Sequence, residues 1–289
     1  MRFGAGGLGF SAGPDHALLP SEREAIARLD PEPEDRRPPF GIELVDEPPW
    51  TSDDESLFPV WEPAVQRWQG ERLLASHRSF TAEIDPLARS ARLHRREQRA
   101  YPLETVIRTS LMARLPLDGG LPLHAAGVVL DGHGVAFFGA SGAGKSTLAA
   151  TSPVGVLSDE LVAIAPVRPF TLVRSGFWGE GGPRGRAAAA PLRLLVDLAK
   201  GPSLELERLR PAIAAARILA SVPVPHVPLL WKRTLAIVAE LVGSTRVVRM
   251  TWSPATPPWT RSEIGSGSRF PCLFSVLMYP ERIPRLYLA

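Results

Sequence analysis

The stretch Val135-Ala-Phe-Phe-Gly-Ala-Ser-Gly-Ala-Gly-Lys-Ser-Thr147 decides how the rest of the chain is interpreted. Its first four residues are apolar and predict a buried strand, and the residues from Thr147 to Ala150 predict the start of a helix. Between them, Gly139 to Ser146 fits the pattern G-x-x-x-x-G-K-[ST] at every fixed position. Glycines let successive backbone N–H groups point at one anion, and the following helix adds partial positive charge. The stretch therefore predicts a loop that binds nucleotide phosphates.

Within this loop, Lys145 is expected to bridge the β- and γ-phosphates, and the hydroxyl of Ser146 is suited to binding Mg²⁺. The expected phosphate-binding residues are Gly139, Ser141, Gly142, Ala143, Gly144, Lys145, Ser146 and Thr147.

The flanking sequence predicts a compact set of strands around the loop. Residues Leu121 to Leu130 form an apolar stretch that predicts a strand, and Asp131-Gly132 is typical of a hairpin turn leading into Val135–Phe138. After the loop, residues 154–164 predict a turn and then a strand. Further strands are expected at 192–198 and 246–252, and helices at 204–219 and 229–242, whereas 170–190 is rich in glycine and alanine and is left unassigned.

Catalysis on a bound phosphate requires a carboxylate for the metal or for the nucleophile. Asp159 and Glu160 follow Lys145 closely, and one of two adjacent acids can hold metal while the other takes a proton from an incoming hydroxyl. Asp197 ends a later apolar stretch, where an ordinary P-loop ATPase usually has its second acid. His124 stands in the strand one hairpin before the loop, so its imidazole can lie near the γ-phosphate.

The order of strand histidine, phosphate loop and paired acids resembles the core of the HPr kinase/phosphorylase superfamily, including the kinases that modify lasso peptide precursors. The resemblance covers residues 121–165 well and is looser beyond them. It implies a P-loop nucleotide-binding α/β core of the phosphoenolpyruvate carboxykinase/HPr kinase type, a mixed sheet with flanking helices. It also implies ATP and Mg²⁺ as cofactors and a protein or peptide partner that carries an acceptor serine or threonine.

The resemblance also implies roles for individual residues. Asp159 matches the first acid, which is associated with the metal, and Glu160 falls on the second acid, usually an aspartate, which serves as general base next to His124. A further metal position corresponds to Glu180. Arg184 and Arg186 lie in a glycine-rich segment from which they can reach phosphate oxygens.

These patterns divide the chain into four expected parts. Residues 1–39 are rich in glycine and proline and predict a loose N-terminal tail, with a short helix over 21–29 that Ser21 would cap. Residues 40–118 predict a small β-rich region, with strands at 40–45, 72–78, 80–85 and 88–94 and a helix from Pro102 to Leu115. Residues 119–254 form the P-loop core, and 255–289 predict an irregular tail.

The composition excludes several classes of protein. The 33 basic and 30 acidic side chains leave a net charge of only +3, so we expect no nucleic-acid partner. A single cysteine, Cys272, rules out an internal disulfide framework. The chain has no apolar run of the ~18 residues that a membrane helix needs and no visible secretion signal, so we expect a cytoplasmic protein that does not contact a membrane. The sequence does not indicate an oligomeric state.

The sequence leaves four functions open. The first is a protein or peptide serine/threonine kinase, and the second is a kinase of a small hydroxyl metabolite on the same scaffold. The third is a P-loop ATPase or nucleotide-gated binding protein that uses Asp197. The fourth is a member of the family that keeps the loop but has lost turnover.

Overall fold

The computed structural model shows a mixed α/β protein with two mixed sheets and few helices. The structure describes residues 1–30, 37–47, 65–70, 72–96, 99–152, 155–179 and 188–253. The chain divides into two compact units, one made of residues 1–122 and 224–234, the other of residues 123–223 and 235–289. Each unit is therefore discontinuous in sequence, and each contains one of the sheets.

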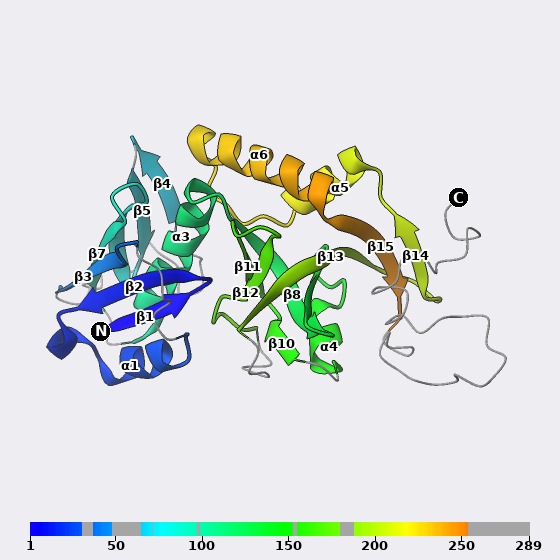
Figure 1. Cartoon of the computed structure of the whole chain (residues 1–289). Coiled ribbons are helices and arrows are strands. Elements are labelled where there is room, and N and C mark those ends of the chain that lie inside the picture. The colour runs from blue at the N-terminus through cyan, green and yellow to red at the C-terminus, as the bar shows by residue number, and fades with distance from the viewer. Residues whose placement is uncertain are drawn as a thin grey trace. The chain divides into compact units, whose positions relative to one another are not determined.

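The first unit is built on a seven-stranded sheet with the order β1-β2-β3-β7-β6-β5-β4 (Figure 1). β2 runs parallel to β3, and β3 runs parallel to β7, while the other neighbours are antiparallel. The strands are β1 (Arg2–Ala5), β2 (Leu8–Gly13), β3 (Phe40–Asp46), β4 (Val65–Gln69), β5 (Arg72–His77), β6 (Phe80–Asp85) and β7 (Ser90–Arg95). The expected strands at 40–45, 72–78, 80–85 and 88–94 correspond to β3, β5, β6 and β7.

The expectation of a loose tail over residues 1–39 is wrong. β1 and β2 form a hairpin whose Gly6 and Gly7 both adopt positive φ (57° and 77°), as a two-residue hairpin turn requires. Phe3 and Phe10 are 2% or less exposed and stack with ring centroids 5.7 Å apart. The glycines that suggested disorder form the turn and leave the alternating apolar residues to face the core.

The short helix expected over 21–29 exists but begins earlier. α1 spans Pro20–Ala27, and its N-cap is Leu19 rather than Ser21. The carboxylate of Glu22 accepts a hydrogen bond of 2.9 Å from the backbone N–H of Leu19, so the acid satisfies the first turn without a hydroxyl cap. Arg95 of β7 forms an ion pair with this carboxylate, and both side chains are 2% or less exposed. This pair joins the start of the chain to the middle of the sheet.

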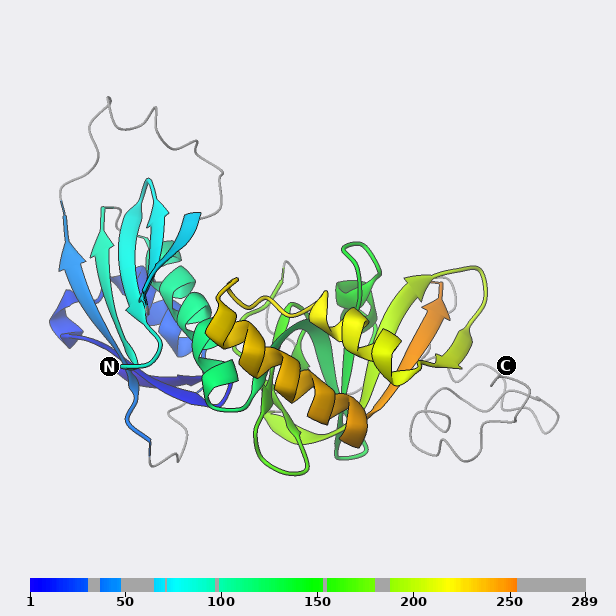
Figure 2. The ribbon, with the colours of Figure 1, turned by 90° about the horizontal axis from the view of Figure 1, so that it is seen from above.

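The helix expected from Pro102 to Leu115 is confirmed as α3 (Tyr101–Leu117). Its apolar residues recur at helical spacing, and all five expected to face the core are 1% or less exposed: Leu103, Val106, Ile107, Leu111 and Leu115. α3 packs against β6 and β7, on one face of the sheet (Figure 2). A short 3₁₀ helix, η1 (Asp15–Ala17), lies between β2 and α1.

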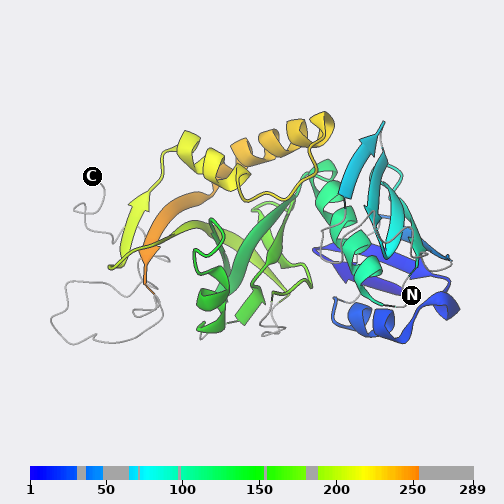
Figure 3. The same cartoon turned by 180° about the vertical axis from the view of Figure 1, so that it is seen from behind.

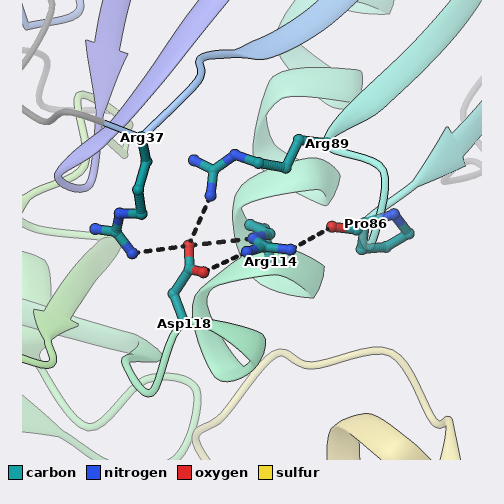
Figure 4. Close-up of polar contacts among 5 residues, drawn as sticks. All are labelled: Arg37, Pro86, Arg89, Arg114 and Asp118. Carbon is teal, nitrogen blue, oxygen red and sulfur yellow. Dashed lines mark hydrogen bonds and ion pairs between the residues drawn. The ribbon is translucent and has the colours of Figure 1, made fainter.

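The end of α3 contributes to a buried cluster of charges in the first unit (Figure 4). Asp118, 6% exposed, accepts from Arg89 Nη1 at 3.2 Å and from Arg114 Nε at 3.1 Å, and pairs with Arg37 at 3.3 Å. Arg114 also donates to the carbonyl oxygen of Pro86 at 2.8 Å. Burial lowers the pKa of Arg89. The charge of Asp118 opposes this shift, and the charges of Arg114 and Arg37 add to it. One carboxylate thus holds three guanidinium groups together.

The second unit is built on an eight-stranded sheet with the order β10-β8-β11-β12-β13-β15-β14, in which β9 pairs with both β8 and β13. The pairings β8-β11-β12-β13-β9-β8 close on themselves, so five strands form a ring. The strands are β8 (Leu121–Leu130), β9 (His133–Phe138), β10 (Gly155–Ser158), β11 (Leu161–Ala165), β12 (Thr171–Arg174), β13 (Ala189–Lys200), β14 (Glu205–Arg208) and β15 (Arg246–Trp252).

The helices around this sheet are α4 (Lys145–Ala150), α5 (Pro211–Leu219) and α6 (Pro228–Ser244). α4 and α5 lie on opposite faces of the sheet (Figure 3). The core on the α4 side contains Leu148, Val196, Leu198 and Trp252, all 4% or less exposed. The chain passes between the two units within α6, between residues 234 and 235.

One expected helix differs from the structure, and the difference has a local cause. Residues 204–219 do not form one helix, because β14 occupies 205–208 and α5 begins only at Pro211. Leu204 and Leu206 alternate with glutamates and fit the two-residue period of a strand. Pro211 begins α5 because a proline is favoured at the first position of a helix. β12 lies in the segment left unassigned. The tail expected at 255–289 lies outside the described residues.

The hairpin that precedes the phosphate loop matches its prediction. Asp131 and Gly132 both adopt positive φ (47° and 75°), and the register pairs Leu130 with His133 and Ala125 with Phe138. No helix in the described part of the chain is long and apolar enough to cross a membrane.

Candidate functional site

The predicted phosphate loop runs from the end of β9 to the start of α4. The side chain of Lys145 is 7% exposed, and its Nζ donates to the carbonyl oxygens of Gly139 at 3.0 Å and Ala140 at 3.2 Å. Burial lowers the pKa of this ammonium group. The loop therefore folds around its own lysine, which holds a positive charge at the centre of the turn.

Trp252, the last residue of β15, packs against the loop. Its indole N–H donates to the carbonyl oxygen of Ala143 at 3.1 Å, and its side chain is fully buried. Gly144 adopts φ +100°, and a Cβ there would lie 2.4 Å from the Trp252 ring. Both the backbone conformation and the close approach of the ring require glycine at this position. Sequence reasoning did not identify Trp252, because its contact with the loop spans more than 100 residues.

The hydroxyl groups of the motif face solvent. Ser141, Ser146 and Thr147 are all exposed, whereas Ala143 and Leu148 are buried in the core. α4 is therefore anchored by its apolar side, and its first turn presents the two hydroxyls of Ser146 and Thr147 outward. This arrangement leaves the serine able to contact a metal ion or a phosphate.

The acidic pair lies in the turn between β10 and β11. Ser158 organises this turn: its hydroxyl donates to the carbonyl oxygen of Phe177 at 2.7 Å and accepts from the backbone N–H groups of Glu160 and Leu161, each at 3.1 Å. The pairing of β10 with β8 shifts register between Val156 and Ser158. Such irregularities commonly re-aim a side chain at the end of a strand. Ser158 is thus a structural residue of the site that the sequence analysis did not identify.

Asp159 is 5% exposed, and its Oδ1 accepts a hydrogen bond of 2.8 Å from the backbone N–H of Gly179. A Cβ at Gly179 would lie 3.0 Å from Asp159 Oδ2, so the absence of a side chain there keeps the second oxygen uncrowded. Glu180, Arg184 and Arg186, the other residues that the sequence suggested on this side, lie outside the described residues.

β8 connects the phosphate loop with the acidic pair. On one side Ala125 is paired with Phe138, the residue before Gly139, and on the other its backbone N–H donates to the carbonyl oxygen of Glu160 at 3.1 Å. His124 precedes Ala125 and is exposed, and Glu160 is half-buried. The backbones of Glu160 and of Phe138, the residue before the loop, therefore both lie next to Ala125, near the middle of β8.

Asp197 is in register with the last residue before the loop, but its side chain lies on the face of the sheet opposite to α4. β13 runs parallel to β9, and Asp197 is paired with Phe138. Its neighbours Val196 and Leu198 pack in the core with α4, so alternation along the strand turns Asp197 toward α5. There its Oδ2 lies 3.8 Å from Arg217 Nε. Burial raises the pKa of Asp197, against the opposing effect of Arg217 and Arg249.

The fit of these residues to a nucleotide-bound Mg²⁺ rests on one hydroxyl and one carboxylate. Mg²⁺ is commonly held by one or two carboxylates together with substrate phosphates, because it retains several waters. Ser146 offers an exposed hydroxyl and Asp159 a carboxylate oxygen with room beside it. No cluster of three or more His, Cys, Asp or Glu side chains suited to a metal ion occurs among the described residues. The donor set therefore fits a metal that arrives with phosphates rather than one held by protein alone.

Comparison with models of known protein families and with curated proteins finds no match for this chain.

Proposed function

We propose that this chain is an ATP- and Mg²⁺-dependent phosphotransferase that resembles HPr kinase and transfers the γ-phosphate of ATP to a serine or threonine hydroxyl of a protein or peptide. One observation carries the proposal: β8 has the phosphate loop on one side and the Asp159-Glu160 turn on the other. A loop alone supports only nucleotide binding. A loop with a paired acid beside the same strand supports transfer to a hydroxyl.

The fold supports a narrower version of the same proposal. A hairpin feeds the loop, α4 has only six residues, and β10 begins soon after it. The hairpin, the loop and the acidic turn soon after it follow the order that the resemblance to the phosphoenolpyruvate carboxykinase/HPr kinase core implies, whereas α4 is shorter than the helix of that family. We therefore propose that the second unit is a P-loop core of that type.

In the proposed reaction, the acceptor hydroxyl oxygen attacks the γ-phosphorus, the bond to the bridging oxygen breaks, and ADP leaves. Lys145 and the backbone N–H groups of residues 142–146 would bind and orient the phosphates, since positioning and charge neutralisation supply most of the rate enhancement. Glu160 would accept the hydroxyl proton beside His124. Ser146 and Asp159 would hold Mg²⁺, which when bound neutralises charge on the phosphate oxygens.

The test is the fate of the γ-phosphate of labelled ATP. The full chain is incubated with Mg²⁺, ATP and a library of serine- and threonine-containing peptides, and the products are separated by mass. Label on a peptide is the expected result, and the Lys145→Ala variant should give none.

Other products of this reaction would contradict the proposal and indicate a different function. Label on a small hydroxyl compound added in a parallel reaction would indicate a metabolite kinase. Free phosphate without transfer would indicate an ATPase, and no turnover despite ATP binding would indicate a non-catalytic protein.

A further inference from the structure

A pocket lies within the second unit, away from the phosphate loop. It has a volume of about 430 Å³ and is formed by the end of β14, the start of α5, the end of α6 and the start of β15. Three arginines line it, Arg208, Arg210 and Arg246, and no acidic side chain does. Arg208 and Arg210 are exposed, and within the described ranges neither forms an ion pair or a side-chain hydrogen bond. The pocket therefore carries a surplus of positive charge.

Thr245 also lines this pocket, and the residue is 7% exposed. Among the residues that the structure describes, its hydroxyl has no hydrogen-bond partner, but it is not one of the fully buried polar atoms that lack one. The hydroxyl is therefore accessible and can bond to a ligand or to water.

The beginning of α5 adds to the positive potential. This nine-residue helix starts at the pocket with Arg210 as its N-cap, has no side-chain cap, and carries no acidic residue in its first turn. The first backbone N–H groups of a helix and its dipole favour an anion. The remaining lining is apolar and includes Leu209 and Val247, both buried.

We propose that this pocket binds a small organic anion, whose phosphate or carboxylate group contacts the arginines and Thr245 and whose compact apolar body lies against Leu209 and Val247. The volume is within the range of small-molecule sites, about 300–1,000 Å³. Guanidinium groups bind such oxyanions through paired hydrogen bonds.

This site is distinct from the phosphate loop. Arg246 begins β15 and Trp252, which supports the loop, ends it. Strands rise about 3.3 Å per residue, so the two ends of β15 are roughly 20 Å apart. The proposal therefore stands or falls independently of the proposed phosphotransferase activity.

The test measures binding of phenyl phosphate and benzoate by isothermal titration calorimetry, with benzyl alcohol as the neutral analogue. The two anions distinguish a phosphate from a carboxylate ligand. The full chain carrying Lys145→Ala is used beside the unmodified chain, so that binding at the phosphate loop is recognised. We expect at least one anion to bind both chains, the alcohol to bind neither, and the affinity to fall with added salt.

The decisive variant is R208Q/R210Q, with R193Q/R233Q as a control that removes the same charge from two exposed arginines elsewhere. The first should weaken binding by about 10-fold or more, because charge-assisted hydrogen bonds are lost, while the control should change it little. Thr245→Val should weaken binding and Thr245→Ser should restore it. Thermal unfolding of each variant verifies that it is folded.

Three results would overturn the proposal. One is the absence of binding by either anion up to about 10 mM. Another is an equal loss of affinity in both double variants, which would indicate unspecific attraction to net charge. The last is loss of binding in Lys145→Ala alone, which would assign the anions to the phosphate loop.

Discussion

Glu160, Asp159 and Asp197 are three carboxylates of the second unit whose surroundings differ. Glu160 is half-buried beside Ala125 of β8, Asp159 is held by the N–H of Gly179, and Asp197 faces α5. We predict that Glu160→Gln lowers the rate of phosphate transfer by ~10²–10⁴-fold with little change in ATP affinity, because an amide cannot accept the proton. Asp159→Asn should weaken the dependence on Mg²⁺, and Asp197→Asn should change neither.

Single-turnover transfer to the labelled peptide, ATP binding and a Mg²⁺ titration on the three variants provide the comparison. If Asp197→Asn abolishes turnover while Glu160→Gln has no effect, the phosphotransferase assignment fails. The ATPase hypothesis, in which Asp197 is the second acid, would then replace it.

Asp197 also gives a prediction about stability and pH. Burial raises the pKa of its carboxyl group above the ordinary value for aspartate, so the folded state binds a proton more tightly than the unfolded state does. The free energy of unfolding that this group contributes is therefore lost as pH rises from the unfolded pKa through the higher folded pKa. An asparagine does not titrate, so the Asp197→Asn variant does not lose this free energy. Its free energy of unfolding should therefore increase relative to that of the unmodified chain as the pH rises from about 3 to 7.

Urea denaturation across this pH range measures the difference. The opposite trend, with the unmodified chain gaining on the variant as pH rises, would mean that attraction to Arg217 and Arg249 outweighs the cost of burial.

At the scale of elements, β1 and β2 should be necessary for the first unit to fold. Phe10 is fully buried, pairs in parallel register with Phe40 of β3, and its ring lies 5.6 Å from that of Phe40. We predict that Phe10→Ala lowers the free energy of unfolding by about 3–5 kcal/mol, the usual cost of truncating a buried phenylalanine. Leu87→Ala, at an apolar residue of the same unit that is 43% exposed, serves as the control.

Denaturant unfolding monitored by circular dichroism measures both variants. A change in Phe10→Ala no larger than that in Leu87→Ala would restore the interpretation of residues 1–39 as a dispensable tail.

The cluster at the end of α3 should be sensitive to loss of its single acid. Asp118→Asn would leave the buried guanidinium of Arg89 and the nearby groups of Arg37 and Arg114 without a countercharge. Breaking a buried ion pair by removing one partner typically costs about 3 kcal/mol or more. We expect a clear fall in the unfolding temperature. Glu43→Gln, which removes the exposed partner of Arg92, should lower it little.

The melting temperatures of the two variants provide the measurement. Equal, small shifts would show that the cluster is solvated in solution and contributes no more than a surface pair.

Elements whose signal is local were predictable from the sequence. The β8–β9 hairpin, α3 and the loop each follow from a short pattern: a turn dipeptide, a helical period and a fixed glycine spacing. β1 and β2 were not predictable, because their glycines suggest disorder until the hairpin pairs with β3. β14 was mistaken for helix, because Leu204 to Arg208 fits both periods and only pairing with β15 decides between them.

The candidate site was predictable to a similar degree. The loop, the acidic pair and His124 were identified because they stand near one another in sequence. The contacts of Trp252 with Ala143 and of Gly179 with Asp159 depend on how distant segments meet. The face on which Asp197 lies follows from strand alternation, but which face carries α4 cannot be known before the sheet is assembled.

At the scale of the whole molecule, ATP should stabilise the chain if it binds the folded loop. A ligand that binds only the folded state at 100 times its Kd adds about 2.7 kcal/mol to the free energy of unfolding. We predict that ATP with Mg²⁺ raises the unfolding temperature in calorimetry and that Lys145→Ala removes most of this increase. An increase of equal size in the variant would place the nucleotide elsewhere on the molecule.

The indole of Trp252 gives the loop an intrinsic optical reporter. Its N–H donates to Ala143, and its ring lies against Gly144, so any rearrangement of the loop changes the surroundings of one chromophore. Tryptophan emission responds to such changes in polarity and hydrogen bonding. Subtracting the spectrum of Trp252→Phe would isolate this signal from the other tryptophans. The response of the loop to added nucleotide could then be followed in real time, by stopped-flow emission, on a chain that carries no added label.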